Sequence, residues 1–321
     1  MFAAKSKYAL LTGVVLAGLL AFFWLVDWSY TIYGVSVDCE PLPAQTPLVP
    51  EYQTDRDHGA VVLMYHHIVP DDELSGDNIG NNAIISYSQF AEEMQYLADN
   101  GYHTFTMSEV AGIIENKLPF PEKTVIITFD DGYASNYTLA YPLLRDYGLK
   151  ATIAVVVVSS LNASEPGGAA LQNIPHLTFA EMREMDASGL VEIGSHSYDG
   201  HGLIRINQGG KQGKFFVDKA WLPYESRMEE QNEYIDRIRQ DLRFSKLVLE
   251  AELGHKVNYF AYPYGVYNSA VSQALADGGF LIAVTTTKGT IDNGSDIFKL
   301  NRRNVDQGIG LDEYAKLLKV D

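Results

Sequence analysis

The sequence predicts an α/β fold, a single distorted (β/α) barrel of the TIM type preceded by one N-terminal transmembrane helix. Strand-like runs alternate with helix-like segments from residue 60 onward, and several of these runs are apolar throughout. Such runs are typical of parallel strands buried on both faces, and this many strand–helix units favour a closed or nearly closed barrel over an open sheet. An uncharged run near the N-terminus predicts the transmembrane helix.

The transmembrane helix is predicted over residues 8–26. Lys5 and Lys7 precede this uncharged run, and Asp27 ends it. About 19 residues with a rise of about 1.5 Å each come close to the thickness of a bilayer core, about 30 Å. The run is long for a cleaved signal peptide and no clean cleavage site follows it, so we expect an uncleaved signal anchor. A cleaved signal peptide is the alternative.

The charges around the anchor predict its orientation. Lysines precede the span and acidic residues follow it, which places the N-terminus inside the cell and the folded part outside. We expect a single-pass cell-membrane protein with an extracytoplasmic domain, or a secreted protein if the segment is cleaved. Its parts would be a cytoplasmic stub with the anchor (1–28), a proline-rich linker (29–59) and one folded domain (60–321).

The periodicity of apolar residues predicts the elements of that domain. Strands are expected at 61–64, 125–129, 151–158, 191–195, 259–261 and 281–285. Helices are expected at 88–100, 134–147, 179–188, 229–253 and 270–277. Gly101, Gly148 and Gly254 follow three of these helices, as glycines do at helix ends. The weakly patterned stretch 202–222 is interpreted as a loop over the site.

Composition limits the classes of partner and metal site. The formal charge is −17, from 24 basic and 41 acidic side chains. A surface this acidic repels nucleic acid, so no nucleic-acid partner is expected. Cys39 is the only cysteine, which excludes an internal disulfide and a cysteine-type zinc site. Any metal would be held by histidines and carboxylates.

Polar side chains stand where predicted strands end. The ends of parallel strands meet at one rim of a barrel, where functional groups gather. The residues at these ends are His66 and His67, the pair Asp130 and Asp131, His196, and the segment 262–265.

Asp130 and Asp131 are adjacent carboxylates after an apolar strand. They repel each other and lose hydration when buried, and a cation beside them offsets both costs. Because neighbours on an extended chain point to opposite sides, Asp131 can bind a metal while Asp130 stays free as a base. The alternative is an ordinary Asp-Asp-Gly turn.

His196 and His201 are five positions apart, with Asp199-Gly200 between them. This spacing does not place them on one helix face, but it suits a tight turn after a strand. With Asp131 they would form a set of two histidines and one carboxylate, which leaves positions open for water and substrate. Zinc suits this set best, and cobalt, nickel or iron also fit. The alternative is that both are surface histidines.

Together these groups favour metal-assisted hydrolysis. Asp130 would take a proton from the attacking water, and a histidine would protonate the leaving amine. His66 and His67 are both candidates for that acid.

Two motifs are similar to those of a known family. The segments Thr128-Phe129-Asp130-Asp131-Gly132 and Ser195 to His201 resemble the first two motifs of the polysaccharide deacetylases, carbohydrate esterase family four with the NodB-homology domain. The longer histidine spacing resembles the branch of extracellular poly-β-1,6-N-acetylglucosamine deacetylases. In that branch the domain is circularly permuted and the catalytic histidine lies in an early Tyr-His motif, which Tyr65-His66 matches.

The resemblance implies a role for each site residue. It implies a NodB-type barrel with Asp130 as base, His66 as acid, and Asp131, His196 and His201 as metal ligands. By the same resemblance, the backbone N–H of Tyr264 would stabilise an oxyanion. By analogy, Arg302 would keep Asp130 ionised. Independently of the resemblance, Tyr133 is one of the tyrosines near the cleft that are expected to stack on sugar rings.

The expected activity is removal of the N-acetyl group from N-acetylglucosamine units of an extracellular or cell-wall polysaccharide. The expected partners are that acetylated amino-sugar polysaccharide and the membrane, and exopolysaccharide export machinery is a further candidate. An O-acetyl esterase on the same barrel and a non-catalytic glycan-binding envelope protein are the alternatives.

Overall fold

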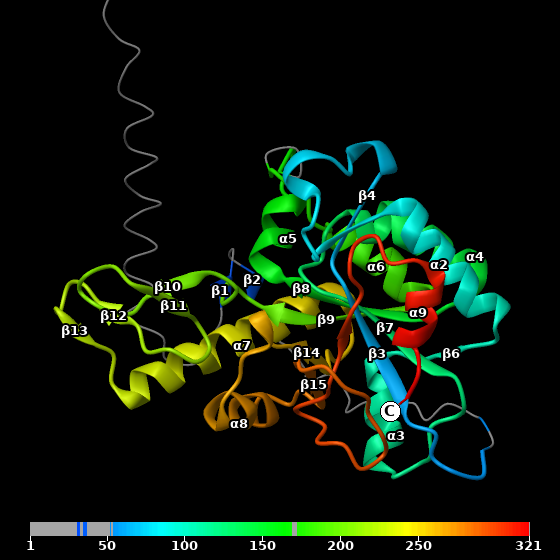
Figure 1. The fold of residues 1–321 in the computed structure, drawn as a ribbon. Helices are drawn as coiled ribbons and strands as arrows, with labels where there is room; N and C mark the ends of the chain where they lie inside the picture. Colours follow the sequence, from blue (N-terminus) through cyan, green and yellow to red (C-terminus); the bar gives the residue numbers. More distant parts are fainter. Residues whose placement is uncertain (1–30, 33–34, 37–51, 53, 169–171, 321) are drawn as a thin grey trace, which may run out of the picture. The chain divides into compact units, whose positions relative to one another are not determined.

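The computed structural model describes residues 31–32, 35–36, 52, 54–168 and 172–320 (Figure 1). The chain divides into two units, residues 1–43 and residues 44–321. In the first unit, β1 (Thr31–Ile32) and β2 (Val35–Ser36) form an antiparallel pair. All other described elements belong to the second unit.

The predicted transmembrane helix, residues 8–26, lies outside the described residues. Within the described ranges, no helix combines the length and the apolar character that crossing a membrane requires.

A parallel sheet of eight strands forms the centre of the second unit. Its order is β15-β14-β9-β8-β7-β3-β16, and β6 also pairs with β7. The strands are β3 (Ala60–Tyr65), β6 (His103–Thr104), β7 (Thr124–Phe129), β8 (Ala151–Val156), β9 (Val191–Ser197), β14 (Tyr259–Ala261), β15 (Ile282–Val284) and β16 (Arg303–Asn304). The predicted α/β class and parallel sheet are confirmed.

One short segment, which includes the edge strand β16, connects the two ends of this sheet. Leu300 forms a parallel bridge with Val284 of β15, and Arg303 pairs with Leu63 of β3. The sheet is therefore curled into a half-barrel whose open side is bridged by residues 300–304, in agreement with the predicted distorted barrel.

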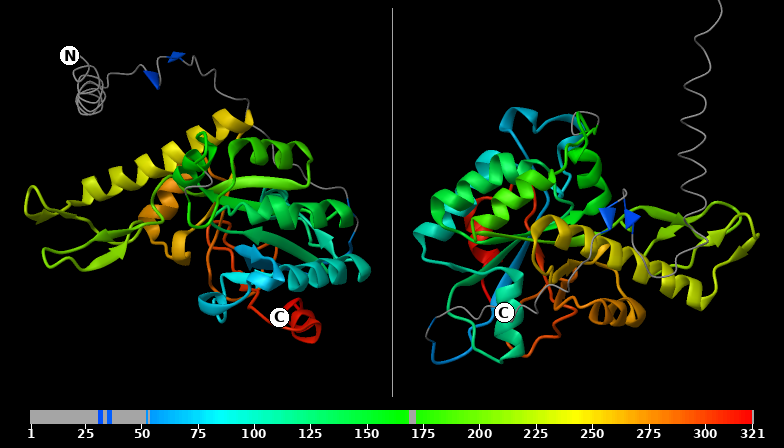
Figure 2. Two further views of the ribbon diagram at one scale, coloured as in Figure 1. Left: turned by 90° about the horizontal axis from the view of Figure 1, so that it is seen from above. Right: turned by 180° about the vertical axis from the view of Figure 1, so that it is seen from behind.

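Successive strand residues face two separate cores, because side chains alternate across a strand. Val61 and Leu63 belong to the cluster that packs against the outer helices, whereas Ala60 and Val62 pack in a second cluster with residues of α3. The helices that surround the sheet in Figures 1 and 2 are α2 (Tyr87–Asp99), α3 (Met107–Glu115), α4 (Tyr141–Tyr147), α5 (Val157–Ser164), α6 (Phe179–Ala187), α7 (Gln231–Leu253), α8 (Ser269–Asp277) and α9 (Leu311–Leu317).

Several predicted boundaries differ from the structure, and three of these differences change the description of an element. The strand predicted at 191–195 continues through Ser197, so His196 lies within β9. The strand predicted at 151–158 ends at Val156, where α5 begins. The helix predicted at 134–147 starts with a π-helical turn, η3 (Asn136–Ala140), before α4. Pro142 lacks the N–H that a continuous α-helical ladder would need there.

The stretch 202–222, predicted as a loop, contains regular structure. The strands β10 (Leu203–Arg205) and β11 (Gln212–Lys214) form one antiparallel pair, and β12 (Trp221–Leu222) and β13 (Arg227–Met228) form another. We call residues 203–228 the arm. It projects from the barrel beside the N-terminal half of α7 in each view (Figures 1 and 2).

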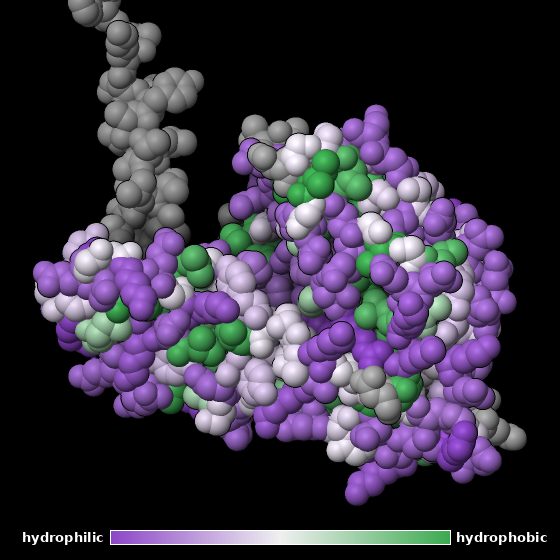
Figure 3. Space-filling model, viewed as in Figure 1, coloured by the Kyte–Doolittle hydropathy of each residue, from purple (hydrophilic) through white to green (hydrophobic). Residues whose placement is uncertain are grey.

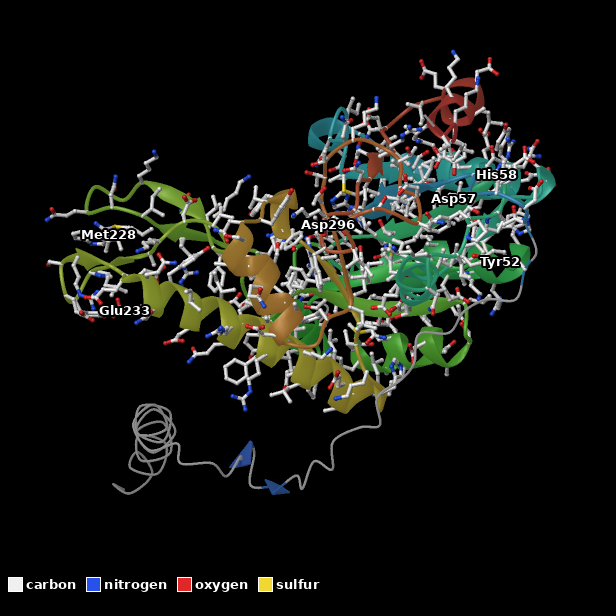
Figure 4. All side chains as sticks on the ribbon, turned by 90° about the horizontal axis from the view of Figure 1, so that it is seen from below. Tyr52, Asp57, His58, Met228, Glu233 and Asp296 are labelled. Atoms are coloured by element: carbon white, nitrogen blue, oxygen red, sulfur yellow. The ribbon has the colours of Figure 1, made fainter. Side chains whose placement is uncertain are left out.

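The arm is tied to the start of α7. The guanidinium of Arg227 donates two hydrogen bonds of 2.7 Å to the carboxylate of Glu233, which is labelled beside Met228 in Figure 4. The strands of the arm have only two or three residues each, too few for a period-two pattern to be recognised.

The remaining short elements lie on the loops. The strands β4 (His67–Val69) and β5 (Ile84–Ser86) form a parallel pair, and short 3₁₀ turns are found at Asp71–Glu73, Gly76–Asn78 and Pro263–Gly265. The first and last of these segments follow β3 and β14, so they border the rim where the predicted site residues lie.

Candidate active site

Asp131, His196 and His201 meet at the carboxyl ends of β7 and β9. The Nε2 atoms of His196 and His201 lie 3.5 Å and 3.3 Å from Oδ1 of Asp131. One ligand atom from each residue lies within 4.8 Å of the other two. The structure therefore brings the three predicted metal ligands together.

The hydrogen bonding of these residues fits a divalent cation. Nδ1 of His196 is 2.8 Å from the carbonyl oxygen of Ala261, so Nδ1 carries the proton and Nε2 offers a lone pair. Burial lowers the pKa of His201, which favours its neutral form. Oδ1 of Asp131 is buried and has no hydrogen-bond partner among the described residues. The Nε2 lone pair of His196 faces a buried carboxylate oxygen that lacks a partner, and this arrangement matches a cation site.

Asp130 pairs with Arg302 inside the barrel. Its two carboxylate oxygens accept hydrogen bonds of 2.8 and 2.7 Å from the guanidinium, and both side chains are buried. Burial alone would raise the pKa of Asp130, but the charge and the hydrogen bonds of Arg302 hold it well below its ordinary value. The expectation that Arg302 sits where it keeps Asp130 ionised agrees with this geometry.

The turn after β7 separates the two aspartates. Asp131 has a φ of 70° and Gly132 a φ of 73°, so the chain reverses immediately after the strand. A Cβ at Gly132 would lie 2.6 Å from the side chain of Val155, which explains the glycine. Asp130 consequently faces the barrel interior, and Asp131 faces the two histidines.

His66 and His67 have different surroundings. Burial lowers the pKa of His66, and the charges of Asp130 and Asp131 oppose that shift. Nδ1 of His66 is buried without a hydrogen-bond partner in the described part of the chain. His67 instead bonds to the Ser135 hydroxyl at 2.9 Å. Of the two histidines, His66 is therefore the one close to both aspartates.

Two tyrosines border the cluster. The Tyr133 ring lies between the rings of His67 and His176, at 4.9 and 5.0 Å, and its hydroxyl hydrogen-bonds to the Asp131 carboxylate. Burial raises the pKa of Tyr133, so the hydroxyl keeps its proton and donates.

Tyr264 lies on the turn that follows β14. Its ring packs against the His201 ring at 4.7 Å between centroids with a tilt of 36°, and its hydroxyl donates to the His201 carbonyl at 2.8 Å. Its φ of 59° marks a tight backbone turn beside the metal ligands.

Sequence reasoning missed two groups that act on the histidines. The Ala261 carbonyl orients His196, and the Asp241 carboxylate bonds to the turn between His196 and His201. A backbone carbonyl leaves no mark in a sequence. Asp241 did leave one, since it is an acidic residue beside Ile238 and Leu242 on the apolar side of a helix.

Comparison with known proteins agrees with this geometry. The sequence profile described as polysaccharide deacetylase matches residues 117–283. A poly-β-1,6-N-acetyl-D-glucosamine N-deacetylase of Escherichia coli (strain K12) is 27% identical over 263 residues, which are 81% of this chain and 38% of that protein. The chain thus spans well under half the length of this relative.

Solved structures show the same fold. A de-N-acetylase from Aggregatibacter actinomycetemcomitans is 28% identical with a TM-score of 0.70, over 80% of this chain and 99% of that one. The BpsB deacetylase domain from Bordetella bronchiseptica is 26% identical with a TM-score of 0.66, over 80% and 100% of the two chains. The profile match covers more than half of the sequence, and these structures share its barrel. The chain therefore belongs to the polysaccharide deacetylase family, hydrolases that act on N-acetyl amide bonds.

Proposed function

We propose that this protein uses a divalent cation to remove the N-acetyl group from N-acetylglucosamine units of an extracellular or cell-wall polysaccharide, releasing acetate. The convergence of Asp131, His196 and His201 beside the Asp130–Arg302 pair carries the proposal. The name of the E. coli relative supports a β-1,6-linked polymer as the first substrate to test.

Asp131, His196 and His201 would hold the cation, and zinc is the ion that best suits two imidazoles and a carboxylate. The cation would polarise the acetamide carbonyl and make a neighbouring water a stronger nucleophile.

The other residues would move protons. Asp130, kept ionised by Arg302, would accept a proton from the attacking water. The oxygen of that water would at the same time bond to the acetyl carbon. His66 would donate a proton to the nitrogen as the C–N bond breaks, giving acetate and a free amine. The rim turn at Tyr264 and the ring of Tyr133 would position the acetamide and the sugar.

The test is acetate release by the purified, zinc-loaded protein. The substrates are β-1,6- and β-1,4-linked N-acetylglucosamine oligomers and an O-acetylated polymer, and cobalt, nickel and iron are loaded in parallel. We expect amide-derived acetate, and a loss of about 10²- to 10⁴-fold in kcat for Asp130→Asn.

Other outcomes would identify the alternatives. Acetate from esters alone would indicate an O-acetyl esterase. Tight glycan binding with no turnover at any metal loading would indicate a non-catalytic binding protein. If no polymer yields acetate and Asp130→Asn behaves like the natural protein, the proposed activity is wrong.

We also propose that residues 1–28 anchor the protein, that residues 29–59 are a linker, and that the barrel acts outside the cytoplasm. The uncharged run at 8–26 supports this location. Fractionation of cells producing the full chain should place it in the membrane. External protease should digest the barrel in spheroplasts, and recovery of intact protein in the cytosol would contradict the proposal.

A further inference from the structure

The turn between His196 and His201 sets the geometry of the proposed metal centre. Four residues separate the two histidines, and β9 ends within them at Ser197. Ser197 has a φ of 131°, a backbone conformation that non-glycine residues rarely adopt. A turn of this kind needs support from outside if His201 is to stay beside Asp131.

Asp241 of α7 supplies such support. Its carboxylate oxygens accept hydrogen bonds of 2.9 Å from the backbone N–H groups of Tyr198 and Asp199, and Gly200 donates a third. Consecutive N–H groups that converge on one anion form a nest, which fixes the backbone that supplies them.

The free-energy cost of burying the Asp241 carboxylate indicates that this residue has a specific role. Asp241 is 6% exposed, and burial raises its pKa to about 6. Burying a carboxylate is unfavourable unless it gains hydrogen bonds, and the bonds it gains here are all to the turn between the two ligands.

The arm holds the same turn from another side. A Cβ on Gly200 would lie 2.7 Å from the ring of Phe216, so the ring packs directly on this backbone. Tyr234 of α7 donates its hydroxyl to the Phe216 carbonyl at 2.6 Å, and Arg237 donates to the Phe215 carbonyl at 2.7 Å. Helix α7 thus fixes both the turn and the part of the arm that packs on it.

We propose that Asp241 is a positioning residue of the metal centre: by binding the backbone of residues 198–200, it holds His201 where it can share a divalent cation with Asp131 and His196. This inference rests on the proposed metal-dependent function. Asp241 acts through the turn and contacts neither the cation nor the substrate.

The test compares Asp241→Asn with Glu250→Gln in the full chain. Glu250 is a matched control because it is a buried carboxylate of the same helix that accepts a backbone N–H, from Val257 at 3.1 Å. It lies nine residues farther along α7, about 13 Å at a rise of about 1.5 Å per residue. Zinc affinity is measured on metal-stripped protein by competition with a chromophoric chelator.

We expect Asp241→Asn to weaken zinc binding by about 10- to 100-fold, as loss of a group that orients metal ligands does. The amide protons of residues 198–200 should also exchange faster with solvent in the metal-free variant than in the natural protein. Glu250→Gln should leave zinc affinity and these exchange rates unchanged. Saturating zinc should restore much of the activity of Asp241→Asn, because its catalytic groups are intact.

A second variant keeps the test decisive if Asp241→Asn fails to fold. Asp241→Glu retains the charge but moves it by one methylene, and it should also lose zinc affinity. If the folded variants bind zinc as the natural protein does, the inference is wrong. If the natural protein itself binds no zinc, the proposed function fails. Amide exchange at residues 198–200 still reports whether Asp241 holds the backbone of this turn.

Discussion

At the scale of single residues, Asp130 and Asp131 have the same side chain but different surroundings. Asp130 is 2% exposed and bonds to Arg302 through both oxygens. Asp131 turns away after a positive φ and has a buried oxygen without a partner in the described part of the chain. An ionised carboxylate held by a guanidinium suits proton transfer, and one with a free oxygen suits metal binding.

Replacing Arg302 should therefore affect stability as well as activity. Arg302→Met leaves the Asp130 carboxylate buried without its partner, which should lower the free energy of unfolding by about 3–5 kcal/mol. It should also raise the pKa of Asp130, since the guanidinium opposes the effect of burial. Urea denaturation at neutral pH measures the loss.

The double variant Arg302→Met with Asp130→Asn is the control. It removes the stranded charge, so it should recover most of the stability while staying inactive. An unfolding free energy of Arg302→Met close to that of the natural protein would contradict this account.

The turn after β7 requires a glycine at position 132 for two reasons, its positive φ and the lack of space for a Cβ. Gly132 and Gly148 both have positive φ, 73° and 65°, but only Gly132 has a neighbour where a Cβ would lie. Gly148→Ala should cost about 1 kcal/mol from conformation alone. Gly132→Ala should cost about 2–3 kcal/mol, because the overlap with Val155 adds to the strain. Equal unfolding free energies of the two variants, measured in urea, would show that crowding at Gly132 is unimportant.

At the scale of elements, α2, β3 and α9 meet at a buried polar cluster behind the site. Glu93 of α2 is 2% exposed. It accepts hydrogen bonds from the Tyr65 hydroxyl at 2.8 Å and from the Gln89 amide at 2.9 Å, and Tyr314 of α9 lies 3.3 Å from the same hydroxyl. Tyr65 directly precedes His66, so this cluster fixes the end of β3.

Glu93 should make the stability depend on pH. Burial raises its pKa from 4.5 to about 7. The contribution of Glu93 to the free energy of unfolding is thus fully present below about pH 4.5 and is lost as the pH rises through about 7. Glu93→Gln should remove this loss and raise the unfolding free energy at pH 8 by about 2 kcal/mol, with little change at pH 5.

Urea denaturation at pH 5, 6.5 and 8 tests this prediction. Glu92→Gln is the matched control, because Glu92 is an exposed neighbour on the same helix. If the stability of Glu93→Gln varies with pH as that of the natural protein does, another group is responsible.

At the scale of the whole molecule, the barrel gathers the site from distant parts of the chain. Residues 66, 130–131 and 196–201 come together because parallel strands end at one rim. Arg302 lies just before β16 and reaches Asp130 through its side chain. The molecular face drawn in Figure 3 is largely hydrophilic, as expected for a chain with a net charge of −17. Binding of a cation at this rim would join β7 and β9 and should stabilise the fold as a whole.

Metal removal should therefore lower the melting temperature. Free zinc at 100 times its Kd adds about 2.7 kcal/mol to the unfolding free energy, and about 1 kcal/mol corresponds to about 2–4 °C in a domain of this size. Calorimetry should show a shift of about 5–10 °C between zinc-loaded and chelator-treated protein. His201→Ala should abolish the shift, and His103→Ala, at an exposed position on β6, should retain it.

Much of the fold was predictable because its signals are local. The strands β3, β7 and β8 are apolar runs, and the ends of α4 and α7 carry glycines in the left-handed conformation. The sheet strands β6 and β16 were not predicted, since two residues carry no periodicity. They exist because neighbouring strands supply their hydrogen bonds.

The sequence by itself determined the barrel class, the family and the residue types of the site. Those depend on periodicity and on short motifs such as Asp130-Asp131-Gly132, and the profile match confirms the polysaccharide deacetylase family. Only the tertiary structure decided which of His66 and His67 lies beside the aspartates, that Ala261 orients His196, and that Asp241 holds the turn before His201. These contacts join residues 40 or more positions apart, and their geometry depends on how the strands and α7 pack, which no local pattern encodes.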